Sequence, residues 1–260
     1  MVKNGKCRIC GYEGKMTFEH LPPKSANNQM EAKVYSGESI VKLLTEEDRL
    51  SWDFTHLKYQ SLQRGTGNYS LCERCNNLTG AYYGEAYSDI ANDFMKYYIN
   101  NKELIEKNDA LECTLHIFPL RFIKQVLSMF CSTTMGLVDE YPELKQLILN
   151  KEQLLNYPNF KVSMYLLKDN VYLVTDKNAE LTIATGETRF VSEMCLFPLG
   201  FVFDYDKNTK DNSLLDITSF LSYKYDDDRR IKMVIPIKHK SIPLPLNYEG
   251  REEYLKRVGK

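Results

Sequence analysis

Two short stretches of sequence decide the fold of the N-terminal part: Cys7-Arg-Ile-Cys10 and Leu71-Cys-Glu-Arg-Cys75. Each holds two cysteines separated by two residues, the spacing of a zinc knuckle. One knuckle supplies two ligands, so both knuckles are needed to close a tetrahedral site of four thiolates. The sequence therefore predicts one structural zinc ion, held by Cys7, Cys10, Cys72 and Cys75.

The distance between the two knuckles leaves alternatives open. A simple zinc ribbon has about 15–20 residues between its cysteine pairs, and here residues 11–71 intervene. Either residues 24–66 are an insertion or the pairs serve different purposes, as unconnected thiols or as a redox motif. The other three cysteines, Cys113, Cys131 and Cys195, stand in apolar surroundings, and we expect them in the core, where free cysteine behaves as a small hydrophobic residue.

A polar residue accompanies each knuckle, which is more than a structural zinc requires. Glu19-His20 follows the first knuckle and precedes Pro22-Pro23, where the chain cannot continue as a helix. Asn76 directly follows the last cysteine of the second knuckle. Glu19 and His20 are adjacent, so on an extended strand they point to opposite faces unless the backbone bends.

The pattern around the knuckles predicts a short strand, an insertion, a second strand and a helix. Residues 15–18 and 68–71 have extended character, and a helix is expected from about Asn76. An apolar stripe at helical spacing predicts its buried face: Tyr83, Tyr87, Ile90, Phe94 and Tyr98. Within the insertion, Ser39–Leu44 is predicted to be helical, and Trp52 and Phe54 to belong to a strand or a packed loop.

The C-terminal half predicts a second α+β unit. The charged stretch at 100–109 is the expected boundary, which divides the chain into domains 1–105 and 106–260. Helices are expected at 118–131, opened by Pro119, and at 142–155. Strands are expected from 159 onward, with a hairpin turning at Lys168-Asp-Asn170 and further strands over 180–203 and 230–237.

Composition limits the class of protein. The 260 residues carry a net charge of −1, so a nucleic-acid ligand would need a local basic patch. Lys24, Arg64 and Arg74 are the candidate phosphate contacts. No apolar run approaches the roughly 18 residues of a membrane span, and residues 1–6 lack an apolar stretch typical of a signal peptide. We expect a cytoplasmic protein with no membrane partner.

In order, the motifs Cys-x-x-Cys, Glu-His-x-Pro and Leu-Cys-x-x-Cys-Asn resemble the zinc-containing HNH endonucleases over roughly residues 5–90. The resemblance implies a ββα-metal fold, in which a hairpin and a helix surround one catalytic divalent cation. The fold class expected is thus α+β, with an HNH-like ββα-metal nuclease domain over 1–105 and an accessory α+β domain over 106–260. The accessory domain would serve target recognition, dimerisation or regulation.

The resemblance also implies roles for single residues. His20 corresponds to the general base, and Glu19 and Asn76 to the ligands of the catalytic cation. Asn68 is the best match to the asparagine that orients the base, although it stands closer to Cys72 than is usual in the family. Oxygen ligands suit Mg²⁺ or Mn²⁺ rather than zinc, and a histidine can accept a proton near neutral pH.

Three functions remain open at this stage. The first is a metal-dependent nuclease that hydrolyses phosphodiester bonds in DNA. The second is a non-catalytic zinc-binding module for nucleic acid or protein, which would need the cysteines but not Glu19, His20 and Asn76. The third places the principal function in residues 105–260, for example as a ligand sensor. Simpler roles are also open for single residues, such as Asn76 or Asn77 as a helix N-cap.

Overall fold

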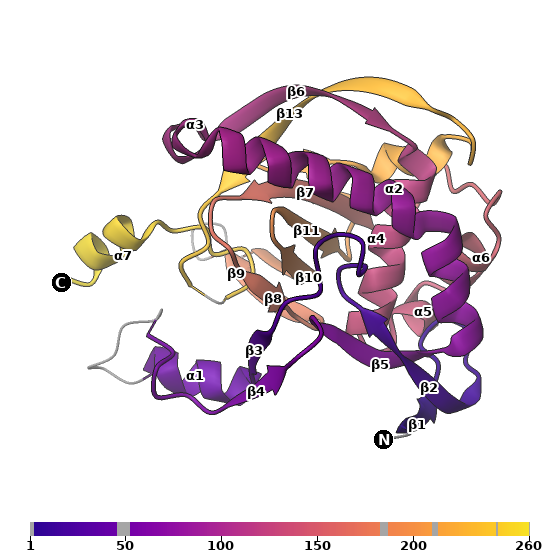
Figure 1. The fold of residues 1–260 in the computed structure, drawn as a ribbon, viewed down its shortest axis with the longest axis horizontal. Helices are drawn as coiled ribbons and strands as arrows, with labels where there is room; N and C mark the ends of the chain where they lie inside the picture. Colours follow the sequence, from indigo (N-terminus) through magenta and orange to yellow (C-terminus); the bar gives the residue numbers. More distant parts are fainter. Residues whose placement is uncertain (1–2, 46–52, 183–186, 210–212, 243, 260) are drawn as a thin grey trace.

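The computed structural model describes residues 3–45, 53–182, 187–209, 213–242 and 244–259. It is a mixed α+β protein in which a small N-terminal sheet and a large C-terminal sheet are joined by two long helices (Figure 1). The α+β class expected from the sequence is confirmed.

The N-terminal sheet has three antiparallel strands in the order β1-β2-β5. They are β1 (Lys3–Lys6), β2 (Glu13–His20) and β5 (Gly67–Cys72), and helix α2 (Glu73–Asn100) begins directly after β5. The two extended stretches and the helix expected from the sequence are present. The register between β2 and β5 shifts between Thr17 and Glu19, so that two residues of β5, Tyr69 and Ser70, lie opposite the single residue Phe18. This is a β-bulge in β5, and it bends that strand.

Residues between β2 and β5 form a lobe that projects from the rest of the molecule (Figure 1). It contains a two-stranded sheet of β3 (Ala32–Tyr35) and β4 (Tyr59–Leu62), and helix α1 (Gly37–Thr45). The expected helix is therefore present. Phe54 lies in a loop and contacts Tyr35, with ring centroids 5.1 Å apart, whereas Trp52 lies outside the described residues.

The large sheet has eight strands among the described residues, along the path β6-β13-β7-β11-β10-β8, with β12 paired to β7 and β9 to β10. Its strands are β6 (Ala110–Ile117), β7 (Lys161–Leu167), β8 (Tyr172–Val174), β9 (Asn178–Thr182), β10 (Glu187–Leu196), β11 (Leu199–Asp204), β12 (Leu215–Asp216) and β13 (Arg229–Lys238). β7 and β11 are buried throughout, because helices cover one side of the sheet and the chain's C-terminal segment approaches the other.

The hairpin predicted at Lys168-Asp-Asn170 is wrong. β7 and β8 flank these residues, but β7 pairs with β11 and β13, whereas β8 pairs with β10 at the end of the sheet path. Alternating side chains identified both strands, yet alternation carries no information about which strand is the partner. The helix predicted over 142–155 is also shorter than expected, since α6 spans Glu143–Leu149.

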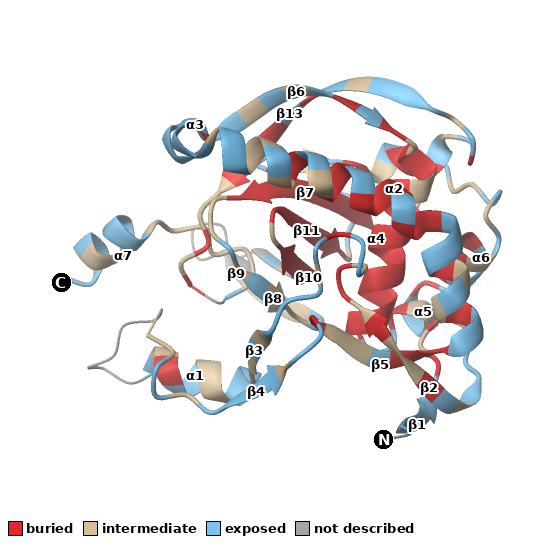
Figure 2. Cartoon of the chain, in the orientation of Figure 1, coloured by how far each residue is buried: buried red, intermediate tan, exposed pale blue. Residues whose placement is uncertain are grey.

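Helix α4 (Pro119–Thr133) is the centre of the molecule (Figure 2). It lies against α2, where Tyr87 and Phe122 stack with ring centroids 5.9 Å apart, and the expected stripe on α2 is buried except for the half-buried Tyr98. One hydrophobic cluster runs from Cys7 to Ile237, so the two halves of the chain share a core. The remaining helices are α3 (Lys102–Lys107), α5 (Leu137–Glu140), the 3₁₀ helix η1 (Thr218–Ser222) and α7 (Arg251–Arg257).

Candidate metal centre and adjoining cleft

The four knuckle cysteines meet at one point between the first two strands and α2. Their sulfur atoms all lie within 4.8 Å of one another, and the Sγ atoms of Cys10 and Cys72 are 3.7 Å apart. Tetrahedral Zn–S bonds of about 2.3 Å place sulfur atoms about 3.8 Å apart. The predicted shared cluster is therefore present, and it could hold a metal such as zinc.

Local backbone geometry shapes the first knuckle. The amide of Gly11 donates to the carbonyl of Cys7 at 2.9 Å, and the amide of Cys7 donates to the carbonyl of Tyr12 at 2.8 Å. Gly11 has a φ of 80°, a conformation that glycine adopts without a steric penalty. The turn thereby brings Cys7 and Cys10 close to Cys72 and Cys75.

Crowding of the thiols changes their acidity. A hydrogen bond from Cys75 is the main reason that the pKa of Cys7 falls to about 4, and the same contact raises the pKa of Cys75. The Cys7 thiolate thus forms readily, and its negative charge opposes deprotonation of the neighbouring thiol of Cys75. A bound cation removes that opposition, because metal binding favours the deprotonated form of every ligand.

A cleft opens beside the cluster and brings together three of the four predicted site residues. It has a volume of about 780 Å³ and runs between β2, the following loop and one face of α2. Its lining includes Glu19, His20 and Asn76. Asn68 pairs with Glu19 across the β2–β5 ladder, but it is not among the described residues that line the cleft.

His20 lies at one wall of this cleft. Its Nε2 is 3.2 Å from the carbonyl oxygen of Arg64, and its ring meets the Phe18 ring edge-on with centroids 5.0 Å apart. Phe18 contacts Tyr69 in turn, and the ammonium of Lys3 lies 4.6 Å from the centre of the Tyr69 ring. An aromatic and basic row therefore leads across the small sheet to the imidazole.

Glu19 lines the cleft, but its carboxyl group is buried near Ser132 of α4 and the knuckle residues Cys7 and Arg8. It is 4% exposed, and neither carboxylate oxygen has a hydrogen-bond partner among the described residues. Burial raises the pKa of this carboxyl from 4.5 to about 8. The hydroxyl of Ser132 lies near enough to oppose that rise, but it is bonded to Ser70 instead. An unpartnered buried carboxylate is costly, so it calls for a proton, a water molecule or a cation.

Asn76 stands in the first turn of α2. Its Nδ2 donates to the Phe18 carbonyl at 3.0 Å and to Thr17 Oγ1 at 3.1 Å. These bonds fix the orientation of the amide and leave Oδ1 as an available acceptor. Because α2 begins at Glu73 with Cys72 as its N-cap, the interpretation of Asn76 or Asn77 as the cap is wrong.

The three predicted phosphate contacts lie in different places. Lys24 lines the cleft, and the backbone carbonyl of Arg64 contacts His20 Nε2. Arg74 is exposed and is not among the residues that line the cleft. Sequence reasoning missed the contribution of α2 and α4 to the cleft: Thr79, Gly80, Gly84, Ser88 and Gln125. A signal for part of this set was available, since positions 76, 80, 84 and 88 carry small or polar residues at a spacing of four.

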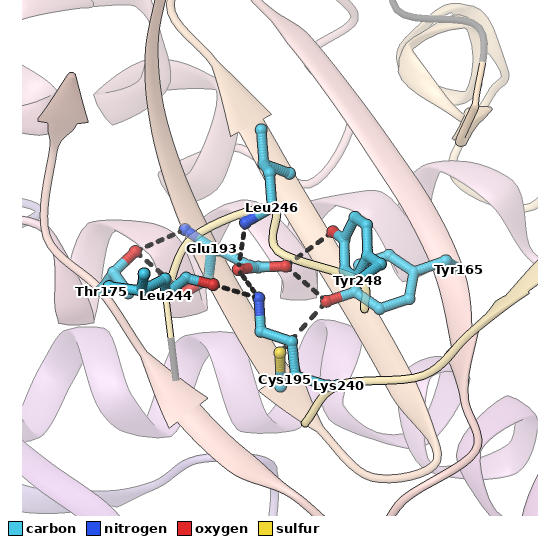
Figure 3. A network of polar contacts seen from close by, with 8 residues as sticks. All are labelled: Tyr165, Thr175, Glu193, Cys195, Lys240, Leu244, Leu246 and Tyr248. Carbon is cyan, nitrogen blue, oxygen red and sulfur yellow. Dashed lines mark hydrogen bonds and ion pairs between the residues drawn. The ribbon is translucent and has the colours of Figure 1, made fainter. Parts of the chain in front are cut away.

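A second buried polar cluster lies on the large sheet (Figure 3). The carboxylate of Glu193 pairs with the ammonium of Lys240 at 2.8 Å, and both side chains are almost fully buried. Glu193 also accepts hydrogen bonds from Tyr165 at 2.6 Å, Tyr248 at 2.7 Å and the amide of Leu246 at 3.0 Å. Both carboxylate oxygens are satisfied, so this cluster serves to hold Lys240, Leu246 and Tyr248 against the sheet.

No described helix is both long enough and apolar enough to cross a membrane. Comparisons of the chain with protein-family models, with curated proteins and with solved structures found no match.

Proposed function

We propose that the protein is a metal-dependent HNH-type endonuclease that hydrolyses phosphodiester bonds in DNA. The observation that carries the proposal is that Glu19, His20 and Asn76 line one cleft next to the four-cysteine cluster. The order of strand, strand and helix around them, β2, β5 and α2, is the order that the HNH resemblance implies.

In this proposal the cysteine cluster holds a structural Zn²⁺ and the cleft holds a catalytic Mg²⁺ or Mn²⁺. The donor atoms fit the second ion, because Glu19 offers two carboxylate oxygens without a partner in the described part of the chain and Asn76 presents Oδ1. Mg²⁺ prefers oxygen ligands. When bound, the cation would neutralise charge on the phosphate and on the leaving oxygen.

His20 is the proposed general base. The contact between Nε2 and the Arg64 carbonyl orients the ring, and the imidazole would take a proton from the water molecule that attacks phosphorus. Lys24 and the row of Lys3, Tyr69 and Phe18 would bind the nucleic acid beside it, since aromatic rings and cations suit bases and phosphates. All seven cysteines are free, which favours a reducing compartment such as the cytoplasm.

The first test is cleavage of plasmid DNA by His20→Ala. We expect wild-type protein to nick or linearise the plasmid with Mg²⁺ or Mn²⁺ and not with EDTA. Loss of the base should slow cleavage by roughly 10²–10⁴-fold, with zinc content unchanged. His56→Ala is the matched control, because His56 is exposed and outside the cleft lining. Equal cleavage by wild type and His20→Ala would reject the role of His20.

A second candidate is a non-catalytic zinc-binding module for nucleic acid or protein. The observation that favours it is the burial of Glu19, which raises the pKa of its carboxyl to about 8, so that this group is protonated near neutral pH in the absence of a cation. Such a module would bind DNA with equal affinity in the presence and absence of Mg²⁺ and would never cut it.

A further inference from the structure

Two glycines on α2 leave part of the cleft open. Gly80 and Gly84 both line the cleft, and a Cβ atom added at either position would meet no heavy atom within 4 Å outside the helix's own backbone. Gly84 is buried nevertheless. The helix therefore presents bare backbone to the cleft at the exposed Gly80 and the buried Gly84, a surface on which a flat group can lie closely.

Helix α4 supplies a polar group at the bottom of this space. Gln125 lines the cleft although it is only 3% exposed, and its Oε1 has no hydrogen-bond partner among the described residues. One turn further along α4, the hydroxyl oxygen of the fully buried Ser128 is also without a partner. Buried amide groups are normally bonded, so the Gln125 carbonyl oxygen calls for a ligand or a water molecule in the cleft, whereas Ser128 is not among the residues that line it.

The charge at this end of the cleft argues against a phosphate. Glu85 and Asp89, exposed residues one turn apart on α2, line the same cleft. Burial and the neighbouring Glu85 raise the pKa of Asp89, as expected for two carboxylates that repel each other. A phosphate belongs nearer to His20 and Lys24, and the glycine end suits a neutral group with N–H donors.

We propose that the cleft receives a single unstacked nucleotide, with its phosphate at His20 and its base in the recess formed by Gly80, Gly84 and Gln125. This inference rests on the proposed function and names its substrate: DNA in which a nucleotide is unpaired or is turned out of the helix. The volume of about 780 Å³ lies within the range of small-ligand pockets. The carboxamide of Gln125 matches the paired donor and acceptor of adenine, so adenine is the preferred base.

The test measures base extrusion without cleavage. Wild-type protein would be mixed, in Ca²⁺ instead of Mg²⁺, with duplexes that carry 2-aminopurine beside a single unpaired adenine or thymine. The fluorescence of 2-aminopurine rises when its neighbour leaves the stack. We expect a rise with wild type and His20→Ala, and binding of the adenine duplex at least about fivefold tighter than the thymine duplex.

Two variants remove the recess by different routes. Gln125→Leu removes the polar group, and Gly84→Leu fills the open space from the other helix. Both should abolish the fluorescence rise and the preference for adenine, whereas Gln146→Leu, an exposed glutamine on α6, should retain them. Circular dichroism and thermal melting would establish that each variant folds.

The outcomes separate the inference from the proposed function. Metal-dependent cleavage of fully paired DNA with no fluorescence rise would overturn the nucleotide recess and leave the nuclease standing. A rise that depends on Gln125, in a protein that cuts no DNA under any metal, would support the recess and reject the nuclease. An unchanged rise in both Gln125→Leu and Gly84→Leu would also overturn the inference.

Discussion

At the scale of single residues, two buried glutamates differ in whether their carboxylates have bonding partners. Glu193 is completely buried and its carboxylate is bonded to Lys240, to two tyrosine hydroxyls and to a backbone amide. Glu19 is buried almost as deeply, and neither of its oxygens has a described partner. The first carboxylate stabilises the fold through its contacts, whereas the second costs stability when charged and is available for a ligand.

Substitution by glutamine should separate the two roles. Glu193→Gln leaves the Lys240 ammonium buried without a counter-ion and should destabilise the protein by roughly 3–5 kcal/mol.

Glu19→Gln should have no effect on the free energy of unfolding in acid and should become increasingly stabilising, relative to the wild type, as the pH rises from 4.5 to about 8. Over that window the folded state of the wild type retains a proton that the unfolded state has lost, so wild-type stability falls with pH.

The measurement is guanidinium unfolding of both variants and the wild type at several pH values, without Mg²⁺ or Mn²⁺. An equal loss of stability in the two variants would contradict this assignment. It would mean that Glu19 has bonded partners in the free protein, which would remove it as a candidate cation ligand.

At the scale of elements, α2 combines a packed face with an empty one. Tyr83, Tyr87, Ile90 and Phe94 are buried against the rest of the core, while Gly80 and Gly84 face open space in the cleft. Glycine within a helix costs roughly 0.5–1 kcal/mol relative to alanine. A helix of 28 residues remains stable despite these two glycines, and their lack of side chains leaves this face of the helix open to the cleft.

Gly80→Ala and Gly84→Ala should therefore each stabilise the protein by roughly 0.5–1 kcal/mol. The added methyl group meets no atom within 4 Å at either site, so no clash offsets the gain in helix propensity. Chemical denaturation of each variant would measure the change. A loss of stability in either one would mean that the recess is closed in solution.

At the scale of the whole molecule, the cysteine cluster joins parts of the chain that are distant in sequence. Cys7 and Cys10 precede β2, and Cys72 and Cys75 stand at the junction of β5 and α2. The first knuckle also contacts the C-terminal half, because Arg8 donates to the carbonyl of Ser132 on α4 at 2.6 Å. A metal in the cluster would thus stabilise contacts well beyond the two knuckles.

Removal of the metal should destabilise the whole protein. If the cluster binds one zinc ion, its removal should lower the free energy of unfolding by roughly 4 kcal/mol, relative to protein in free zinc at about 1,000 times the dissociation constant. Elemental analysis should find one zinc per chain in the wild type and much less in Cys75→Ser. Cys113→Ser is the matched control, since Cys113 is half-buried and outside the cluster. Equal zinc content in both variants would refute the four-cysteine site.

The sequence predicted local features well and long-range partners poorly. The knuckle spacing predicted the cysteine cluster, and the stripe from Tyr83 to Phe94 predicted the buried face of α2, because both depend on near neighbours. The pairing of β8 with β10 and the approach of Gln125 to the cleft depend on how distant segments fold together. Nothing within α4 distinguishes Gln125 from a polar residue at the surface, and only the packing of α4 against α2 places it at the cleft.

The insertion between β2 and β5 should be dispensable for the cluster. Leu21 and Thr66, at the base of the lobe, are bonded through the amide of Leu21 and the carbonyl of Thr66 at 3.0 Å. Farther out, Ala32 pairs with Leu62, so an Asn-Gly turn can replace residues 33–61. The shortened protein should keep its zinc content and unfold within about 1 kcal/mol of the wild type. Loss of zinc would show instead that the lobe supports the knuckles.

A segment whose two ends already meet can change its length without altering the distance that the chain has to bridge. In evolutionary terms, the part of the lobe beyond the Ala32–Leu62 pair is a position at which this lineage could acquire, exchange or lose a module while the knuckles and the cleft stayed in place. For the experimenter, the same geometry makes the tip of the lobe the natural attachment point for a fluorescent reporter. A reporter placed there would follow the protein in a cell while leaving His20 and its surroundings undisturbed.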